Sequence, residues 1–126
     1  MLSGAKNANV YVDWLAYIRR PETRDAFRYF IGLAAGLSSL TCYPQAKGAV
    51  FAFRFYIGKD QPFAFIVNRS SLLFYFRAPA VRSGKYSFDR LNDAFDSAAE
   101  PRSEEWTVRL QTVADVQRLW KLVDVQ

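Results

Sequence analysis

The sequence predicts a two-layer α+β domain, in which helices pack on one face of an antiparallel sheet in the order α-α-β-β-β-α-β-α. Three consecutive runs between residues 49 and 77 have strand length and are rich in aromatic and branched side chains. Turn-forming residues separate these runs, and apolar residues recur at helical spacing on both sides of them. The 126 residues are therefore expected to form a single domain, 1–126, with residues 1–9 as a loose polar lead-in.

The three runs are expected to pair as a β-meander. They span residues 49–57, 63–67 and 72–77. Because side chains alternate between the two faces of a strand, most phenylalanines fall on one face, and arginine and tyrosine fall on the other. A five-residue connection predicts Phe55 opposite Phe65, and a short turn after the second run predicts Phe65 opposite Phe74. The three rings then form one row across the sheet, which sets the register of the strands.

Before the meander, the sequence predicts two helices. The first covers 10–20, with a strand over 10–12 as the alternative, and the second covers 21–40. Pro21 at a first helical position, followed by acidic residues, is typical of a helix N-terminus. Tyr43 and Pro44 are expected to stop the second helix, which leaves Cys42 at its C-terminal end as a small buried residue.

After the meander, two helices and a fourth strand are expected. Residues 79–85 form a loop, Ser87 caps a helix over 88–98, and residues 100–105 form a charged connector. The alternating run 106–110 is the fourth strand, which adds Trp106 to the phenylalanine face and Arg109 to the opposite face. Thr112 and Asp115 have the spacing of a capping box at the start of the last helix, 113–123.

Composition narrows the function classes. Hydrophobic residues make up 51% of the chain and aromatic residues 17%, which argues against disorder and leaves more rings than a small core needs. The formal net charge of +5 favours anionic partners. Histidine is absent and Cys42 is the single cysteine, which argues against a hydrolase triad, a zinc enzyme and an internal disulfide.

No metal and no cofactor are expected. The first residues have no apolar core of the signal-peptide type, and no segment has the length of a membrane span without charge. A cytoplasmic protein without a membrane partner is therefore expected.

The sheet face opposite the phenylalanines holds the main site candidate. Arg54, Arg77 and Arg109 come from three strands, and Tyr56 and Tyr75 lie between them. Guanidinium groups bind phosphates, and tyrosine rings are stacking surfaces for unpaired bases. The alternative is an ordinary solvated or helix-covered face, on which arginine stems pack against rings.

A second basic group surrounds Pro21 and comprises Arg20, Arg24 and Arg28. Helical spacing puts Arg24 and Arg28 on one face, where they are able to straddle a phosphate backbone. A solvated helix surface is the alternative for this group, as it is for the acidic residues at 89, 93 and 96.

From about residue 49 onward, the predicted elements follow one order: a meander that includes 63–77, a helix over 87–98 with an acidic outer face, a strand that begins with Trp106, and a closing helix over 113–123. This order resembles that of the small bacterial-type MmcQ/YjbR α+β domains. The strand–helix opening of those domains is replaced here by the two helices predicted before the meander. The resemblance implies a DNA- or RNA-associated role.

These observations favour a non-enzymatic module that binds nucleic acid or another polyanion through the arginine–tyrosine face. The alternative is a protein-interaction or homodimerisation module that uses its surplus aromatic residues as an interface. A third hypothesis is a pocket for a small anionic ligand between the sheet and the helix over 21–40.

Overall fold

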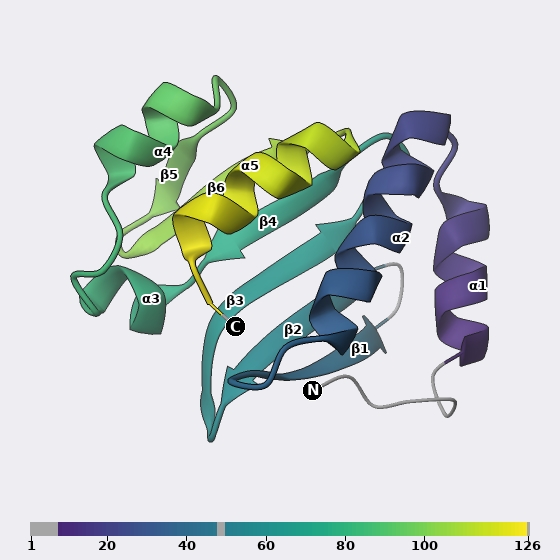
Figure 1. The fold of residues 1–126 in the computed structure, drawn as a ribbon, viewed down its shortest axis with the longest axis horizontal. Coiled ribbons are helices and arrows are strands. Elements are labelled where there is room, and N and C mark those ends of the chain that lie inside the picture. Colours follow the sequence, from purple (N-terminus) through teal and green to yellow (C-terminus); the bar gives the residue numbers. More distant parts are fainter. Residues whose placement is uncertain (1–7, 48–49, 126) are drawn as a thin grey trace.

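The computed structural model describes residues 8–47 and 50–125 (Figure 1). The helices are α1 (Ala8–Tyr17), α2 (Pro21–Ala35), α3 (Ala78–Arg82), α4 (Phe88–Ala94) and α5 (Val113–Val123). The strands are β1 (Thr41–Lys47), β2 (Val50–Ile57), β3 (Asp60–Val67), β4 (Leu72–Phe76), β5 (Ala99–Arg102) and β6 (Glu105–Leu110). The fold is α+β, as predicted. Within these residues, no helix has the length and apolar character needed to cross a membrane.

The strands form one six-stranded antiparallel sheet in the order β1-β2-β3-β4-β6-β5. The predicted meander is β2-β3-β4, and the predicted fourth strand is β6, which pairs with β4. Two rows of apolar side chains cross the sheet on one face. One row is Phe53–Phe65–Phe74–Val108, and the other is Phe55–Phe63–Phe76–Trp106. All eight of these residues are buried, and we call their side of the sheet the core face.

The predicted pairing of Phe65 with Phe74 is confirmed, but the predicted pairing of Phe55 with Phe65 is wrong. Phe65 lies opposite Phe53, and Phe55 lies opposite Phe63. The cause is the turn: β2 and β3 are joined by Gly58 and the residue after it, and not by five residues. Gly58 has φ +61°, which a glycine adopts without steric cost. The shift is by two residues, so it leaves every side chain on its predicted face.

Three elements were not predicted. Residues 41–47, read as the end of a helix and a loop, form the edge strand β1; Cys42 is therefore a buried strand residue and not a helix C-terminal residue. Residues 99–102 form β5 where a connector was expected, and residues 78–82 form the short helix α3 where a loop was expected. α2 ends at Ala35 and α4 at Ala94, each before its predicted end.

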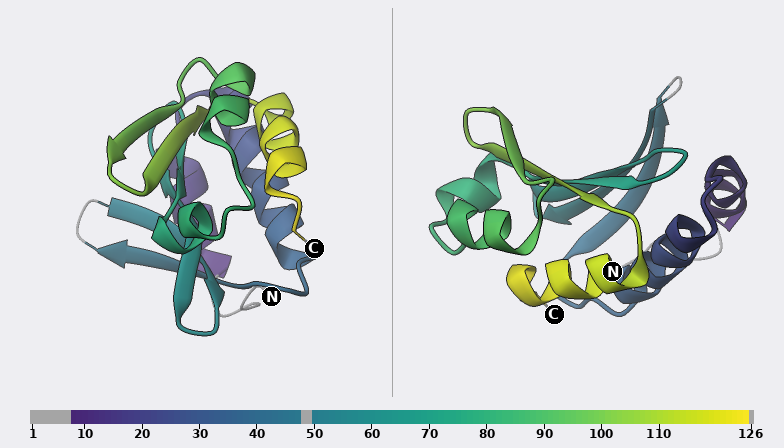
Figure 2. Two further views of the ribbon diagram at one scale, coloured as in Figure 1. Left: turned by 90° about the vertical axis from the view of Figure 1, so that its left-hand side faces the viewer. Right: turned by 90° about the horizontal axis from the view of Figure 1, so that it is seen from above.

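α2 and α5 cover the core face, and Figure 2 (right) shows them together on one side of the sheet. Phe30 of α2 is fully buried and stacks on Phe65 with ring centroids 4.7 Å apart. It also contacts Trp120 of α5, at 5.3 Å. Each such ring pair contributes about 0.5–1.5 kcal/mol beyond the burial of its area. The space between α2 and the sheet is thus filled by aromatic rings.

Thr23, in the first turn of α2, forms hydrogen-bond contacts with two segments that are distant in sequence. Its buried hydroxyl lies 3.0 Å from the carbonyl oxygen of Ser70, in the β3–β4 turn, and 3.0 Å from that of Gln111, between β6 and α5. α5 begins with the predicted capping box, in which the Thr112 hydroxyl accepts a hydrogen bond from the Asp115 amide and the Asp115 carboxylate accepts one from the Thr112 amide. These contacts hold the helices on the core face and leave the opposite face of the sheet, which we call the outer face, without a helix over it.

Candidate functional site

The predicted site residues fall on the outer face because they alternate with the buried phenylalanines. One cross-strand row runs Tyr43–Arg54–Ala64–Tyr75–Thr107. Tyr56 follows Arg54 on the same side of β2, Arg77 follows Tyr75 at the end of β4, and Arg109 lies on β6 opposite Leu73. The structure therefore brings Arg54, Tyr56, Tyr75, Arg77 and Arg109 to one face, over which none of the described helices lies.

Arg54 is held by amide side chains and not by carboxylates. Its Nε donates to Oε1 of Gln45 at 2.7 Å, and one terminal nitrogen donates to Oε1 of Gln61 at 2.9 Å. Both partners are neutral, and within residues 8–47 and 50–125 no ion pair compensates the charge of the guanidinium. Contacts with these described residues use two of its five N–H donors. Arg54 is therefore both fixed in position and able to bind an anion.

Arg109 and Arg77 are equally free of carboxylates. A terminal nitrogen of Arg109 donates to the Ser71 hydroxyl at 3.2 Å. Among residues 8–47 and 50–125, neither Arg77 nor Arg109 has a carboxylate within 4.0 Å, and the ion pairs that do form involve other arginines. Salt bridges therefore do not neutralise the positive charge of the outer face.

Arg102 is a further cation of this face that sequence reasoning missed. It lies on the edge strand β5 opposite Glu105. It is close enough to Tyr75 for its positive charge to favour a lower pKa of the Tyr75 hydroxyl. Residues 100–105 read as a connector because Pro101 and four charged residues interrupt any alternation, so the pattern offers no strand signal. On β2, β4 and β6, alternate residues face the outer side of the sheet. Among those that the structure describes, Glu105 is the one that carries a carboxylate.

Tyr75 lies at the centre of this charged group. Partial burial raises the pKa of its hydroxyl, as does the nearby Glu105 carboxylate, while Arg109, Arg77 and Arg102 act in the opposite direction. The phenol is therefore neutral at physiological pH. Three guanidinium groups and one carboxylate thus surround a neutral, half-buried ring.

Tyr43 is a second residue that sequence reasoning missed. It lies on β1 beside Arg54, is 44% exposed, and contacts the Tyr56 ring edge-on with centroids 5.6 Å apart. The alternation of Cys42, buried, with Tyr43 and Gln45, exposed, is a usable strand signal. Pro44 hid this signal, since a proline reads as a helix stop, although edge strands tolerate it.

The second basic group is not part of the outer face. Arg24 and Arg28 lie on α2, which covers the core face. Arg20 pairs with Glu22 at 3.3 Å and Arg28 pairs with Asp25 at 3.1 Å, while Nε of Arg24 donates to the Ile18 carbonyl at 2.6 Å. Arg20 and Arg28 are thus paired with carboxylates, unlike Arg54, whose partners are amide oxygens, and Arg109, whose partner is a hydroxyl.

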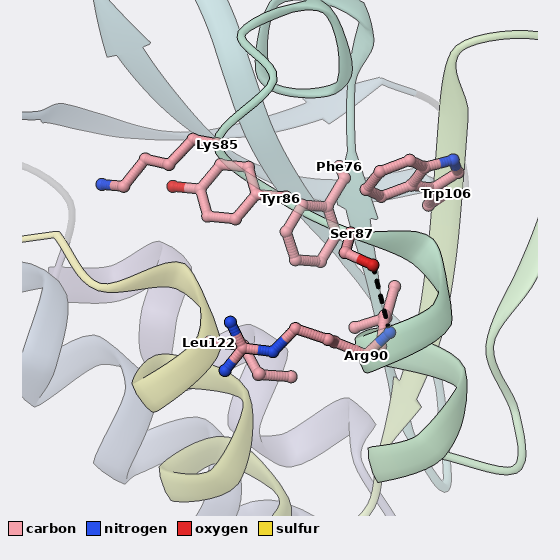
Figure 3. Close-up of a pocket in the computed structure, with 8 residues that line it drawn as sticks. Phe76, Lys85, Tyr86, Ser87, Arg90, Trp106 and Leu122 are labelled. Carbon is pink, nitrogen blue, oxygen red and sulfur yellow. Dashed lines mark hydrogen bonds between the residues drawn. The ribbon is translucent and has the colours of Figure 1, made fainter.

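A small cavity lies between α4, α5 and the sheet (Figure 3). Lys85, Tyr86 and Arg90 are among its lining residues, and the Ser87 hydroxyl accepts a hydrogen bond from the Arg90 amide. Its volume is about 30 Å³. That space holds one or two water molecules, whereas metabolite pockets have volumes of about 300–1,000 Å³. The cavity is therefore too small for an anionic metabolite.

The acidic residues of the α4 region are exposed: Asp89, Asp93 and Asp96. In the part of the chain that the structure describes, no three acidic or cysteine side chains are grouped so that they could hold a metal ion. Comparisons of the chain with protein-family models, with curated proteins and with solved structures found no match.

Proposed function

We propose that the protein is a binding module, not an enzyme, that holds nucleic acid or another polyanion on its outer face. The observation that carries the proposal is the uncompensated charge of this face. Among residues 8–47 and 50–125, no carboxylate lies within 4.0 Å of the guanidinium groups of Arg54, Arg77 and Arg109. Arg54 donates to two amide oxygens, and Arg109 donates to a hydroxyl. Guanidinium groups in this state are suited to phosphates, which they bind through two parallel N–H donors.

Nucleic acid is the polyanion that the face fits best, because rings accompany the cations. Tyr56 and Tyr75 are half-buried, so each presents part of its ring to solvent. Bases stack on such rings irrespective of sequence, and phosphates pair with the surrounding arginines. The resemblance of the element order to MmcQ/YjbR-type domains favours the same class of partner.

The expected affinity is modest and depends strongly on salt. Each phosphate that an arginine neutralises contributes about −0.7 to −0.9 to the slope of log K against log salt concentration. Contacts from Arg54, Arg77 and Arg109 then give a slope of roughly −2 to −3. We expect dissociation constants near those of non-specific binders, about 10⁻⁴ to 10⁻⁶ M at physiological salt.

Fluorescence anisotropy of labelled oligonucleotides, over a series of salt concentrations, tests the proposal with two matched triple variants. The first changes Arg54, Arg77 and Arg109 to glutamine. The control changes Arg90, Arg118 and Lys121 to glutamine, on α4 and α5. Both remove three positive charges, which lowers the formal net charge from +5 to +2.

The outer-face variant is expected to lose most of the affinity and most of the salt slope, while the control keeps both. Equal losses in the two variants would mean that binding follows net charge alone and would refute the role of the outer face. Sedimentation of the unliganded protein distinguishes this proposal from the alternative of a homodimerisation module. A stable dimer that buries Tyr56 and Tyr75 would mean that the outer face binds a second copy of the chain and not a polyanion.

A further inference from the structure

The outer face has a pattern of planar groups that stand above small residues. In the row Tyr43–Arg54–Ala64–Tyr75–Thr107, Ala64 is 3% exposed and Thr107 is 7% exposed. Because no helix of the described residues lies over this face, the longer side chains beside them cover these two residues. The tyrosine rings and the Arg54 guanidinium therefore form the surface of the row.

Tyr75 is the ring of this row that the cations flank. It is half-buried, so part of the ring remains open to solvent and to a stacked base. Arg109, Arg77 and Arg102 are near enough for their charges to act on its hydroxyl. A base that stacks on Tyr75 therefore has its phosphates close to guanidinium groups.

Cations lie on both sides of Tyr75 along the direction of β4. Arg77 and Arg102 line the same open hollow, of about 310 Å³, at one end of the strand, together with Lys59 and with the carboxylates of Asp60, Glu104 and Glu105. Arg109 lies opposite Leu73, towards the other end. Leu73 and Arg77 are four residues apart, so the two groups of cations are separated by roughly 13 Å along the strand. That length accommodates successive phosphates of one extended strand, with Tyr75 between them.

We propose that the occupant of the outer face is single-stranded nucleic acid, which runs along β4 with phosphates on Arg77, Arg102 and Arg109 and a base stacked on Tyr75. This inference rests on the proposed function and adds the strandedness of the ligand and the role of Arg102. In a duplex the base faces are covered by their neighbours, so the rings have nothing to stack on, whereas an unpaired strand exposes them. Only a single strand engages both the rings and the guanidinium groups.

The test compares a single-stranded and a double-stranded DNA probe of equal length, and one RNA probe, with five proteins. The probes are a labelled oligothymidylate of about 16 nucleotides, the upper end of the site sizes of single-strand-binding folds, and its duplex with oligoadenylate. An oligouridylate of the same length shows whether RNA binds as well as DNA. The proteins are the wild type, Tyr75→Leu, Tyr75→Phe, Arg102→Gln and the control Tyr29→Leu, whose ring lies on α2 beside α5.

We expect the single strand to bind more tightly than the duplex. Tyr75→Leu is expected to weaken single-strand binding by roughly 5- to 100-fold, whereas Tyr75→Phe, which keeps the ring, changes it by less than about 3-fold. Arg102→Gln should reduce the single-strand salt slope by about 0.7. Tyr29→Leu should bind like the wild type. Circular dichroism of each variant confirms that the fold is retained.

The outcomes separate this inference from the proposed function. Equal or tighter binding of the duplex overturns the single-strand inference. A Tyr75→Leu variant that binds the single strand as tightly as Tyr75→Phe also overturns it. Both outcomes leave salt-dependent binding by the arginines intact. Absence of binding to both probes at low salt overturns the proposed function itself. An unchanged salt slope in Arg102→Gln removes Arg102 from the phosphate contacts.

Discussion

Two tyrosines that pack on the core differ in one hydrogen bond, so Tyr→Phe should destabilise the protein at one position and not at the other. The Tyr11 hydroxyl, on α1, is buried and has no hydrogen-bond partner among the residues that the structure describes. The Tyr86 hydroxyl donates to the Val123 carbonyl, at the end of α5, at 2.7 Å. Both rings contact phenylalanines of the core face. Tyr→Phe removes only the hydroxyl oxygen in each case.

The expected changes follow from the partners. A net hydrogen bond contributes about 0.5–1.5 kcal/mol, so Tyr86→Phe should destabilise the protein by about 1 kcal/mol. A buried polar group without a partner costs about 1–3 kcal/mol, so Tyr11→Phe should leave the stability unchanged or raise it by up to that amount. For a domain of this size, about 1 kcal/mol corresponds to a shift of roughly 3–6 °C in Tm.

Equilibrium urea unfolding, followed by circular dichroism, measures both variants against the wild type. The slope of the free energy against urea should stay constant, because the same surface is exposed on unfolding. A Tyr11→Phe variant less stable than the wild type by about 1 kcal/mol would contradict the reasoning, since the hydroxyl would then have a partner in solution.

The alkaline pH range provides a second measurement for Tyr11. Burial raises the pKa of its hydroxyl from 10.0 to about 12. The unfolded chain then loses this proton at lower pH than the folded protein, so the contribution of neutral Tyr11 to stability is complete below pH 10 and is lost as the pH rises towards 12. Tyr11→Phe has no such proton, and its stability should therefore decline less steeply over this range.

Two further predictions concern other parts of the fold. Cys42 is fully buried, and burial raises the pKa of its thiol to about 11. A thiol reagent at pH 8 should therefore label Cys42 only at the rate at which the protein unfolds. Labelling within seconds in native buffer would contradict the structure. Thr112→Ala removes the capping box of α5 and should cost about 1 kcal/mol in urea unfolding. Thr112→Ser keeps the hydroxyl and should recover most of that loss, and an equal loss in both variants would show that the cap is not the cause.

The sheet faces could be predicted from the sequence although part of the register could not. Phe53, Phe55, Phe63, Phe65 and Phe74 all lie on the predicted face, because alternation depends only on the order of residues along a strand. The pairing of β2 with β3 depends on the conformation of the turn. The chain turns at Gly58, and a bulge near residue 61 absorbs the extra residue. Neither feature leaves a mark in the hydrophobic pattern.

The two missed strands were hidden for different reasons. β1 contains Pro44, whose local preference is to end regular structure, and only its place at the sheet edge makes it compatible with a strand. β5 is exposed along its whole length and has a bulge against β6, so it lacks the hydrophobic alternation that marks a half-buried strand. Consequently, Arg54, Tyr56, Tyr75, Arg77 and Arg109 could be placed on one face from the sequence, whereas Tyr43 and Arg102 could not.

Pro44 has a consequence for the behaviour of the protein at high concentration. Among the described strands, β1 and β5 are the two edges of the sheet, and β1 pairs with β2 alone. An edge strand is a template on which a second chain can extend the sheet into an aggregate. Because proline has no N–H group, an incoming strand would lose a hydrogen bond at residue 44. The sheet contains three consecutive strands rich in aromatic residues, β2, β3 and β4. At one edge of this sheet, Pro44 therefore opposes polymerisation.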